Sequence, residues 1–376
     1  MSLKKKVRGF WISCQQELFP WLEEVLGPVA GRHRKLLLAL EMVSVERFLP
    51  SVADRRPGRP LKHRAPLARA FLAKMVFDIS TTTALVERVR SDPTLRRLCG
   101  WSSLREVPSE STFSRAFKEF AEADLPARLH AVLIEQGYAD QLVGHISRDS
   151  TAIEAREKPV PKEKRIRPKR KRGRPRKGEE RPKELSRLER QRTMNLEEML
   201  AELPKPCTVG VKRNAKGYKQ SWTGYKLHMD VADGGIPISC IVSSASLHDS
   251  QAAIPLMTKT AQRVRNLYDL MDSAYDAKEI HAHSERLGHV PIIDPNPRRH
   301  GKAERSRQQK AQRAAGLELP HRERYKERST VERAFGRLKD EFGGRHVRVR
   351  GHKKVTCHLM FGVLALTVDQ LMRLLH

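Results

Sequence analysis

The chain has 376 residues, and its 73 lysines and arginines outnumber its 44 aspartates and glutamates, which gives a formal net charge of +29. Such an excess indicates a negatively charged partner, which could be nucleic acid, an anionic membrane surface or an acidic protein. The hydrophobic fraction of 39% is enough for a packed core and excludes a wholly disordered basic tail.

Membrane-spanning and secreted proteins are disfavoured by three features of the sequence. No run of about 20 uninterrupted apolar residues is present, so we expect no membrane span. The basic start is followed by only a short apolar run at 9–14, so we expect no signal peptide. The five cysteines are widely spaced without a CxxC pair, which argues against disulfides and zinc fingers. We therefore expect a cytoplasmic protein.

Residues 1–140 are predicted to form a helical DNA-binding domain. Apolar residues recur at helical spacing in three segments separated by prolines, at 32–49, 65–79 and 83–89. A short helix that ends at Gly100 is predicted next. A loop and a second helix, which begins at Ser109 or Ser111, then follow.

A helix-turn-helix is predicted near residues 93–120. Its second helix carries three phenylalanines on one face and Arg115 and Lys118 on the other face. This arrangement suits a helix that enters a DNA major groove with its basic face. A plain helical bundle with a solvated basic face remains the alternative.

Residues 141–376 are predicted to form an α/β catalytic domain with a mixed sheet. Short apolar or alternating runs predict five strands, at 143–150, 223–233, 236–244, 267–272 and 290–294. Helical patterns are found at 250–264, 277–287, 327–342 and 356–375, and Asp249 is expected to cap the first of these helices. Three strands precede the first of these helices, which excludes a Rossmann repeat.

A basic insertion is predicted at about residues 157–206, between the first two strands. Residues 158–177 contain twelve lysines and arginines against the single Glu163, with almost no hydrophobic residue. Such a stretch cannot pack, so we expect it to be mobile in the free protein. A charged helix is predicted after it, at about 184–200.

The insertion contains an Arg-Gly-Arg-Pro pattern, which is typical of an AT-hook that binds a narrow minor groove. A polycation that clamps phosphates without reading the groove width remains the alternative. The basic residues of the pattern are Lys171, Arg172, Arg174 and Arg176.

Two aspartates are candidates for a metal site because each one ends a predicted strand. Asp149 ends the first strand and Asp272 ends the fourth. A carboxylate at a strand end is well placed to bind a metal ion, although a single aspartate there is more often a turn former or a cap.

A third acid, Glu332, lies in a segment with Tyr325, Arg328 and Lys339. If one helix continues back to Tyr325, the four side chains share a strip of its surface, because successive residues are about 100° apart. One carboxylate between two cations suits a phosphodiester-cleaving site. A solvated helix with an Arg328–Glu332 ion pair remains the alternative.

This spacing, Y-(2)-R-(3)-E-(6)-K, resembles the signature of DDE transposases of bacterial insertion sequences, in particular the insertion-sequence 4/5-type group. The residues after Asp149 and Asp272, the segment 224–228 and the helical segment before the first strand also resemble this family. The resemblance covers residues 65–375.

The resemblance implies an RNase H-like core in which Asp149, Asp272 and Glu332 are catalytic and bind two Mg²⁺ ions, with Mn²⁺ as a possible substitute. It also implies that Tyr325, Arg328 and Lys339 bind DNA near the scissile bond. The implied reaction is cleavage of DNA strands at transposon ends and their transfer into target DNA.

The implied partner is double-stranded DNA, both the terminal inverted repeats and the target, bound by a homodimer in the bacterial cytoplasm and nucleoid. A transposase-derived DNA-binding regulator without catalysis and an RNase H-superfamily nuclease remain alternatives.

Overall fold

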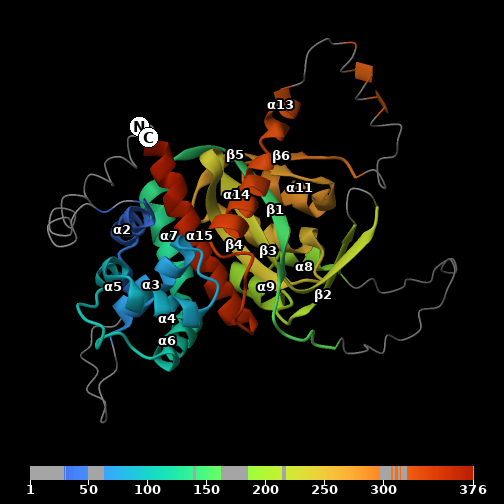
Figure 1. Cartoon of the computed structure of the whole chain (residues 1–376). Coiled ribbons are helices and arrows are strands. Elements are labelled where there is room, and N and C mark those ends of the chain that lie inside the picture. The colour runs from blue at the N-terminus through green and yellow to red at the C-terminus, as the bar shows by residue number, and fades with distance from the viewer. Residues whose placement is uncertain are drawn as a thin grey trace.

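The computed structural model of the chain describes 29, 31–49, 63–138, 141–161, 185–213, 217–296, 306–307, 310–311, 314 and 320–375. The N-terminal helices lie on one side of the long C-terminal helix α15 (His352–Leu375), and the sheet with its helices lies on the other (Figure 1).

The described residues between 31 and 138 are mostly helical, as predicted. The elements are α2 (Gly31–Val43), η1 (Val45–Phe48), α3 (Arg64–Val76), α4 (Thr82–Ser91), α5 (Pro93–Cys99), α6 (Glu110–Glu122) and α7 (Leu125–Tyr138). The N-cap of α5 is Asp92, whose side chain accepts a hydrogen bond from the Leu95 amide, and its C-cap is Gly100, whose φ of 100° favours glycine.

The short helix, the loop and the second helix near 93–120 are confirmed. Ser109 is the N-cap of α6. The three phenylalanines of α6 are buried, and Phe113 and Phe117 pack on Phe71 of α3. Arg115 and Lys118 are exposed on the opposite face, where Lys118 lies 3.7 Å from Glu122.

A six-stranded mixed sheet follows. Its strands are β1 (Leu142–Glu154), β2 (Thr208–Arg213), β3 (Lys219–Ala232), β4 (Ile236–Ser244), β5 (Arg265–Met271) and β6 (Val290–Ile293). The order across the sheet is β2-β3-β1-β5-β6, and β4 pairs with β3. β3 is antiparallel to β1, β2 and β4, whereas β1, β5 and β6 are parallel. This α/β arrangement is the RNase H-like mixed sheet that the resemblance implied.

One prediction for the insertion was wrong in detail, and one strand just after the insertion was not predicted. The single helix expected at 184–200 is two short helices, α8 (Arg187–Gln191) and α9 (Leu196–Glu202). They are separate because Ser186 and Asn195 each form a capping box that starts a new helix. Strand β2 was not predicted, although Val209 and Val211 alternate in it with small or polar residues.

Helices α10 (Ala253–Ala261), after η3 (Asp249–Ala252), and α11 (Lys278–Arg286) lie on one side of the sheet. On the other side is α14 (Ser329–Glu341), which contacts β1 and β3. The basic stretch 162–184, with Lys171, Arg172, Arg174 and Arg176, lies outside the described residues, so the expectation of mobility and the AT-hook stay predictions.

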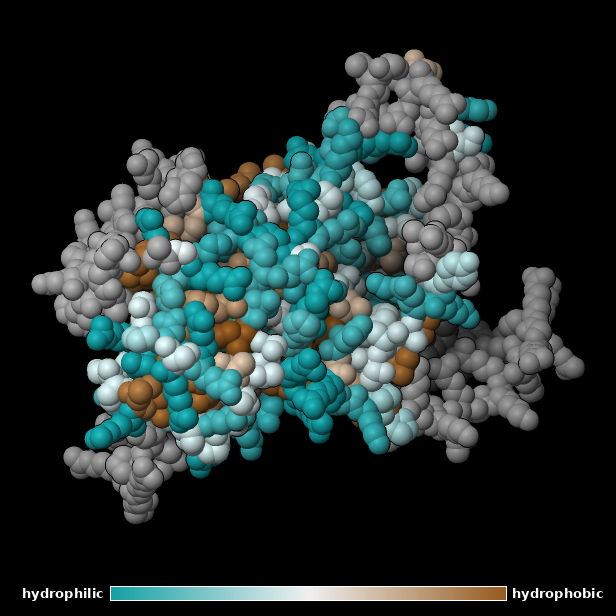
Figure 2. All heavy atoms as spheres, in the orientation of Figure 1, coloured by the Kyte–Doolittle hydropathy of each residue, from teal (hydrophilic) through white to brown (hydrophobic). Residues whose placement is uncertain are grey.

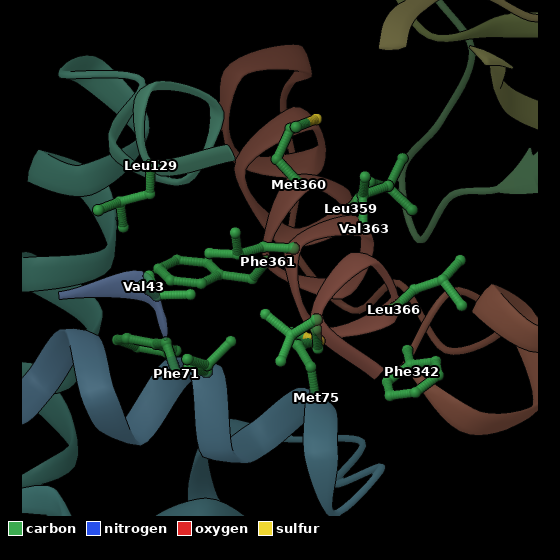
Figure 3. Close-up of a cluster of buried hydrophobic side chains, with 14 of the residues drawn as sticks. Val43, Phe71, Met75, Leu129, Phe342, Leu359, Met360, Phe361, Val363 and Leu366 are labelled. Atoms are coloured by element: carbon green, nitrogen blue, oxygen red, sulfur yellow. The ribbon is translucent and has the colours of Figure 1, made fainter. Parts of the chain in front are cut away.

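α15 joins the helical part to the sheet. It contacts α7, α3 and α6 on one side and β4 on the other. Figure 3 shows Phe361 of α15 facing Phe71 of α3, with Leu366 and Phe342 farther along the same interface. Within the described residues, α15 contains the single segment long and apolar enough to cross a membrane, and 78% of that segment is buried inside the protein.

Candidate active site

Asp149 and Asp272 are brought side by side by the pairing of two parallel strands. β1 and β5 pair in register up to Ser147 and Leu270. Two further residues along each strand lead to Asp149 and Asp272, and neighbouring strands are about 4.8 Å apart. The two carboxylates are therefore adjacent. Asp272 directly follows β5, as predicted, but the prediction that Asp149 ends the first strand was wrong, because β1 pairs with β3 as far as Glu154.

The two carboxylates are held in the same way. The Ser150 amide donates a hydrogen bond to Asp149 Oδ1 at 2.7 Å, and the Ala274 amide donates one to Asp272 Oδ1 at 2.9 Å. In each case the backbone just after the aspartate fixes one oxygen. This leaves Oδ2 of each side chain to face other groups, and Oδ2 of Asp149 lies 3.6 Å from Arg328 Nη1.

Burial raises the pKa of the Asp149 carboxyl to about 7, and the nearby charges of Asp272 and Asp249 add to this effect. Burial also raises the pKa of Asp272, with a further contribution from Asp249. The opposing effects of the amide hydrogen bonds and of Arg328 are smaller than the cost of burial. These two carboxylates therefore bring together negative charge that a bound cation would stabilise.

The segment from Tyr325 to Lys339 is not one continuous helix. The sequence prediction that placed its four polar side chains on one strip assumed a continuous helix, and that assumption was wrong. α13 (Pro320–Lys326) ends before a turn at Glu327 and Arg328, and α14 begins at Ser329. The turn is fixed by the Ser147 hydroxyl, which donates a 2.8 Å hydrogen bond to the Glu327 carbonyl. Because Ser147 lies two residues before Asp149 on β1, this contact places the turn beside the carboxylates.

Arg328 contacts one acid of α14 and one acid of β1. Its Nη2 donates a 2.5 Å hydrogen bond to Glu332 Oε1, and its Nη1 lies 3.6 Å from Asp149 Oδ2. Tyr325 lies next to it, with the guanidinium 5.9 Å from the ring centroid. Burial raises the pKa of Tyr325 to about 12, and nearby carboxylates contribute, so its phenol is a hydrogen-bond donor at neutral pH.

Lys339 lies farther along the same face of β1. Its Nζ donates a 2.6 Å hydrogen bond to the Thr151 hydroxyl. Ser147, Asp149 and Thr151 are alternate residues of one strand, and each contacts α14 or the turn that precedes it. The structure thus brings Tyr325, Arg328, Glu332 and Lys339 along β1, with Asp149 in the middle. Hydrophilic side chains cover much of the face on which α14 lies (Figure 2).

Asp249 was expected to be a helix cap, and that prediction was wrong. It is the first residue of η3, whose N-cap is His248. Its Oδ1 accepts hydrogen bonds from the Ser150 hydroxyl at 2.6 Å and from Lys226 Nζ at 2.8 Å. Ser150 therefore contacts two acids: its amide donates a hydrogen bond to Asp149, and its hydroxyl donates one to Asp249. The segment 224–228 contained Lys226, but nothing in the sequence indicated its partner.

The donor set partly fits a divalent cation. Asp149 and Asp272 supply adjacent carboxylate oxygens, the hard ligands that Mg²⁺ prefers. Glu332 is engaged with Arg328, and its side chain is 52% exposed, so it would reach a shared ion by leaving that pair. Within the residues that the structure describes, no three His, Cys, Asp or Glu side chains are grouped closely enough to hold an ion together.

We expect the metal-free Asp149→Asn variant to be more stable than the natural protein above neutral pH. The folded pKa near 7 exceeds the unfolded value near 3.8, so ionising Asp149 costs folding free energy as the pH rises from about 4 to about 7. The gain is at most about 4 kcal/mol and is constant above that range. Thermal melting in a chelator from pH 4 to 8 measures it, and equal melting temperatures at pH 8 would contradict the burial argument.

Comparisons with known proteins agree with this geometry. A family model described as a transposase DDE domain matches residues 149–368, which is more than half of the chain and starts at the first aspartate of the site. A second model, described as a transposase domain (DUF772), matches residues 32–119. No curated protein and no solved structure gave a match.

Proposed function

Because the chain belongs to the family of transposases with a DDE domain, we propose that it cleaves DNA strands at the ends of an insertion sequence and joins them to target DNA. The observation that carries the proposal is the alignment of Asp149, within β1, with Asp272, directly after the neighbouring parallel strand β5, beside the turn that carries Arg328. Members of this family use divalent metal ions, and we propose two Mg²⁺ ions here, with Mn²⁺ as a substitute.

We propose that Asp149, Asp272 and Glu332 hold these ions. When bound, the ions would activate water or a 3′-hydroxyl and stabilise the departing oxygen. Arg328 and Lys339 would bind phosphates on either side of the scissile bond, because they flank Asp149 along β1. The phenol of Tyr325 would donate a hydrogen bond to a phosphate oxygen.

The helical residues 1–140 would recognise the terminal inverted repeats, and residues 141–376 would carry out the chemistry. Arg115 and Lys118 support this division because they are exposed on the helix that follows the predicted turn. The basic residues Lys171, Arg172, Arg174 and Arg176 would add affinity for double-stranded DNA. Two DNA ends must meet, so we propose a homodimer on DNA. The assignment to the 4/5-type group stays a prediction.

A strand-transfer assay tests the proposed function. The purified protein, a duplex that carries the inverted repeat flanking its gene, a target plasmid and MgCl₂ should yield cleaved and joined products. Cleavage without joining would instead favour a nuclease of the RNase H superfamily. Specific binding without cleavage in Mg²⁺ or Mn²⁺ would favour a regulator derived from a transposase.

Asp249→Asn is expected to slow cleavage about 10- to 100-fold without weakening DNA binding, because side chains that orient metal ligands have effects of this size. The substitution weakens the contacts of Ser150 and Lys226 with the carboxylate, and Ser150 also holds Asp149. Single-turnover cleavage and fluorescence anisotropy measure the two effects. Asp233→Asn, just after β3, is the matched control, because Asp233 also accepts hydrogen bonds but lies beside the start of β1. A natural cleavage rate in Asp249→Asn would remove Asp249 from the positioning of Asp149.

A further inference from the structure

The segment 345–350, which follows α14, has alternating inward and outward side chains. Val347 is buried in the main hydrophobic core, and Val349 packs against that core. His346, Arg348 and Arg350 alternate with them and are exposed. An extended chain places alternate side chains on one side, so the valines fix the backbone while the basic groups face solvent. We call residues 345–350 the basic segment.

A cleft of about 260 Å³ lies between the basic segment and the end of β1. Arg345, His346 and Arg348 line it from one side, and Glu154 and Arg156 line it from β1 and the residues just after it. The Arg350 Nε donates a 3.1 Å hydrogen bond to the Arg156 carbonyl, which ties the two walls together. The cleft is therefore built by two segments that are nearly 200 residues apart in the chain.

The cleft lies beyond the candidate active site in the direction of β1. Along β1, Asp149 is followed by Thr151, which binds Lys339, and then by Glu154 at the cleft. Burial lowers the pKa of Lys339, and the nearby positive charges of Lys212 and Arg345 lower it further. Lys212 belongs to β2, so three separate elements bring cations to this end of β1.

Part of this positive charge is balanced by carboxylates, including Glu157, which accepts a hydrogen bond from the Gly351 amide, and part is uncompensated. Arg345 forms an ion pair with Asp340, and Glu154 supplies one carboxylate to the cleft. Within the described part of the chain, Arg348 forms no ion pair or hydrogen bond, and residues 342–354 contain no acidic side chain. A row of cations along an extended chain suits a ligand whose negative charges also repeat along a line.

We propose that this cleft binds the phosphodiester backbone of the DNA strand that enters the active site, on the Lys339 side of the scissile bond. The proposal rests on the proposed function, because that function places the DNA strand at Asp149. Arg348 and Arg156 would contact successive phosphates, and Lys212 on β2 would bind the strand from the opposite side. A single small anion would need only one of these cations.

Arg348→Ala tests the site through the salt dependence of binding to a fluorescein-labelled DNA duplex, measured in a chelator so that no cleavage occurs. The magnitude of the slope of log K against log salt concentration should fall by about 0.9, the value of one lost phosphate contact. Arg348→Lys should restore the slope, because it keeps the charge. Arg265→Ala is the matched control, since Arg265 is exposed at the other end of β5.

An unchanged slope in a folded Arg348→Ala variant, or an equal fall in Arg265→Ala, would overturn the proposal. Thermal melting shows whether each variant is folded. A second variant, Arg348→Cys carrying an iron chelate that cuts DNA, should cut a bound insertion-sequence end beside the cleavage position, and cutting elsewhere would contradict the location. These readouts need no catalysis by the protein. If the protein binds DNA through the cleft but never cleaves it, the proposed function is refuted and the binding site is not.

Discussion

Asp149→Asn is expected to lower DNA cleavage by at least about 10³-fold, about 4 kcal/mol of transition-state stabilisation, while DNA binding is retained. The amide side chain still accepts the hydrogen bond from the Ser150 amide, so the local backbone is preserved. It removes one of two adjacent negative charges, and with it the electrostatic attraction for divalent ions. Single-turnover cleavage and duplex binding by anisotropy measure the two effects.

Asp233→Asn is the matched control, because Asp233 is an aspartate at the other end of β1 that contacts Gly144 and His145. It should cleave DNA at a rate close to that of the natural protein. Cleavage by Asp149→Asn within ten-fold of the natural rate would exclude Asp149 from the catalytic group. Equal losses in both variants would point to general damage to β1, since Asp233 contacts the first residues of that strand.

Arg148→Met is expected to destabilise the folded protein by about 3–5 kcal/mol, the usual effect of removing one partner of a buried ion pair. Arg148 lies beside Asp149 in sequence but faces the opposite side of the sheet. Its Nη2 donates a 2.6 Å hydrogen bond to Asp230 Oδ2, and its Nη1 lies 3.7 Å from Asp269 Oδ1. All three side chains are at most 1% exposed. Urea unfolding at pH 7 measures the loss.

The double variant Arg148→Met/Asp230→Leu should recover part of this stability, because it leaves no unpaired Asp230 carboxylate in the interior. Asp269 would remain beside Ser284, which donates a 2.6 Å hydrogen bond to it, and His289 at 3.0 Å. Arg373→Ala breaks an exposed ion pair with Asp369 and should cost less than about 1 kcal/mol. A loss below 1 kcal/mol in Arg148→Met would show that the buried pair is not needed for stability.

The sequence predicted the N-terminal helices, five of the six strands and the helices that cover the sheet, because each has a local apolar period. It did not predict β2, whose short alternation follows two prolines and resembles a loop. It predicted a helix from 327 and allowed that helix to continue back to Tyr325, because the residues at the turn are good helix formers. The break at Arg328 is imposed by the contact of Ser147 with the Glu327 carbonyl, which is 180 residues away in the chain.

The sequence by itself determined which residues carry charge next to apolar strand patterns and at helical spacing, and the family resemblance of these motifs selected Asp149, Asp272, Glu332, Arg328 and Lys339. The tertiary structure decided which of them meet. The β1–β5 register aligns the two aspartates, Arg328 joins Asp149 to Glu332, and Ser150 joins Asp149 to Asp249. Local periodicity reflects burial of one face of an element, whereas these contacts depend on strand register and side-chain hydrogen bonds between segments distant in the chain.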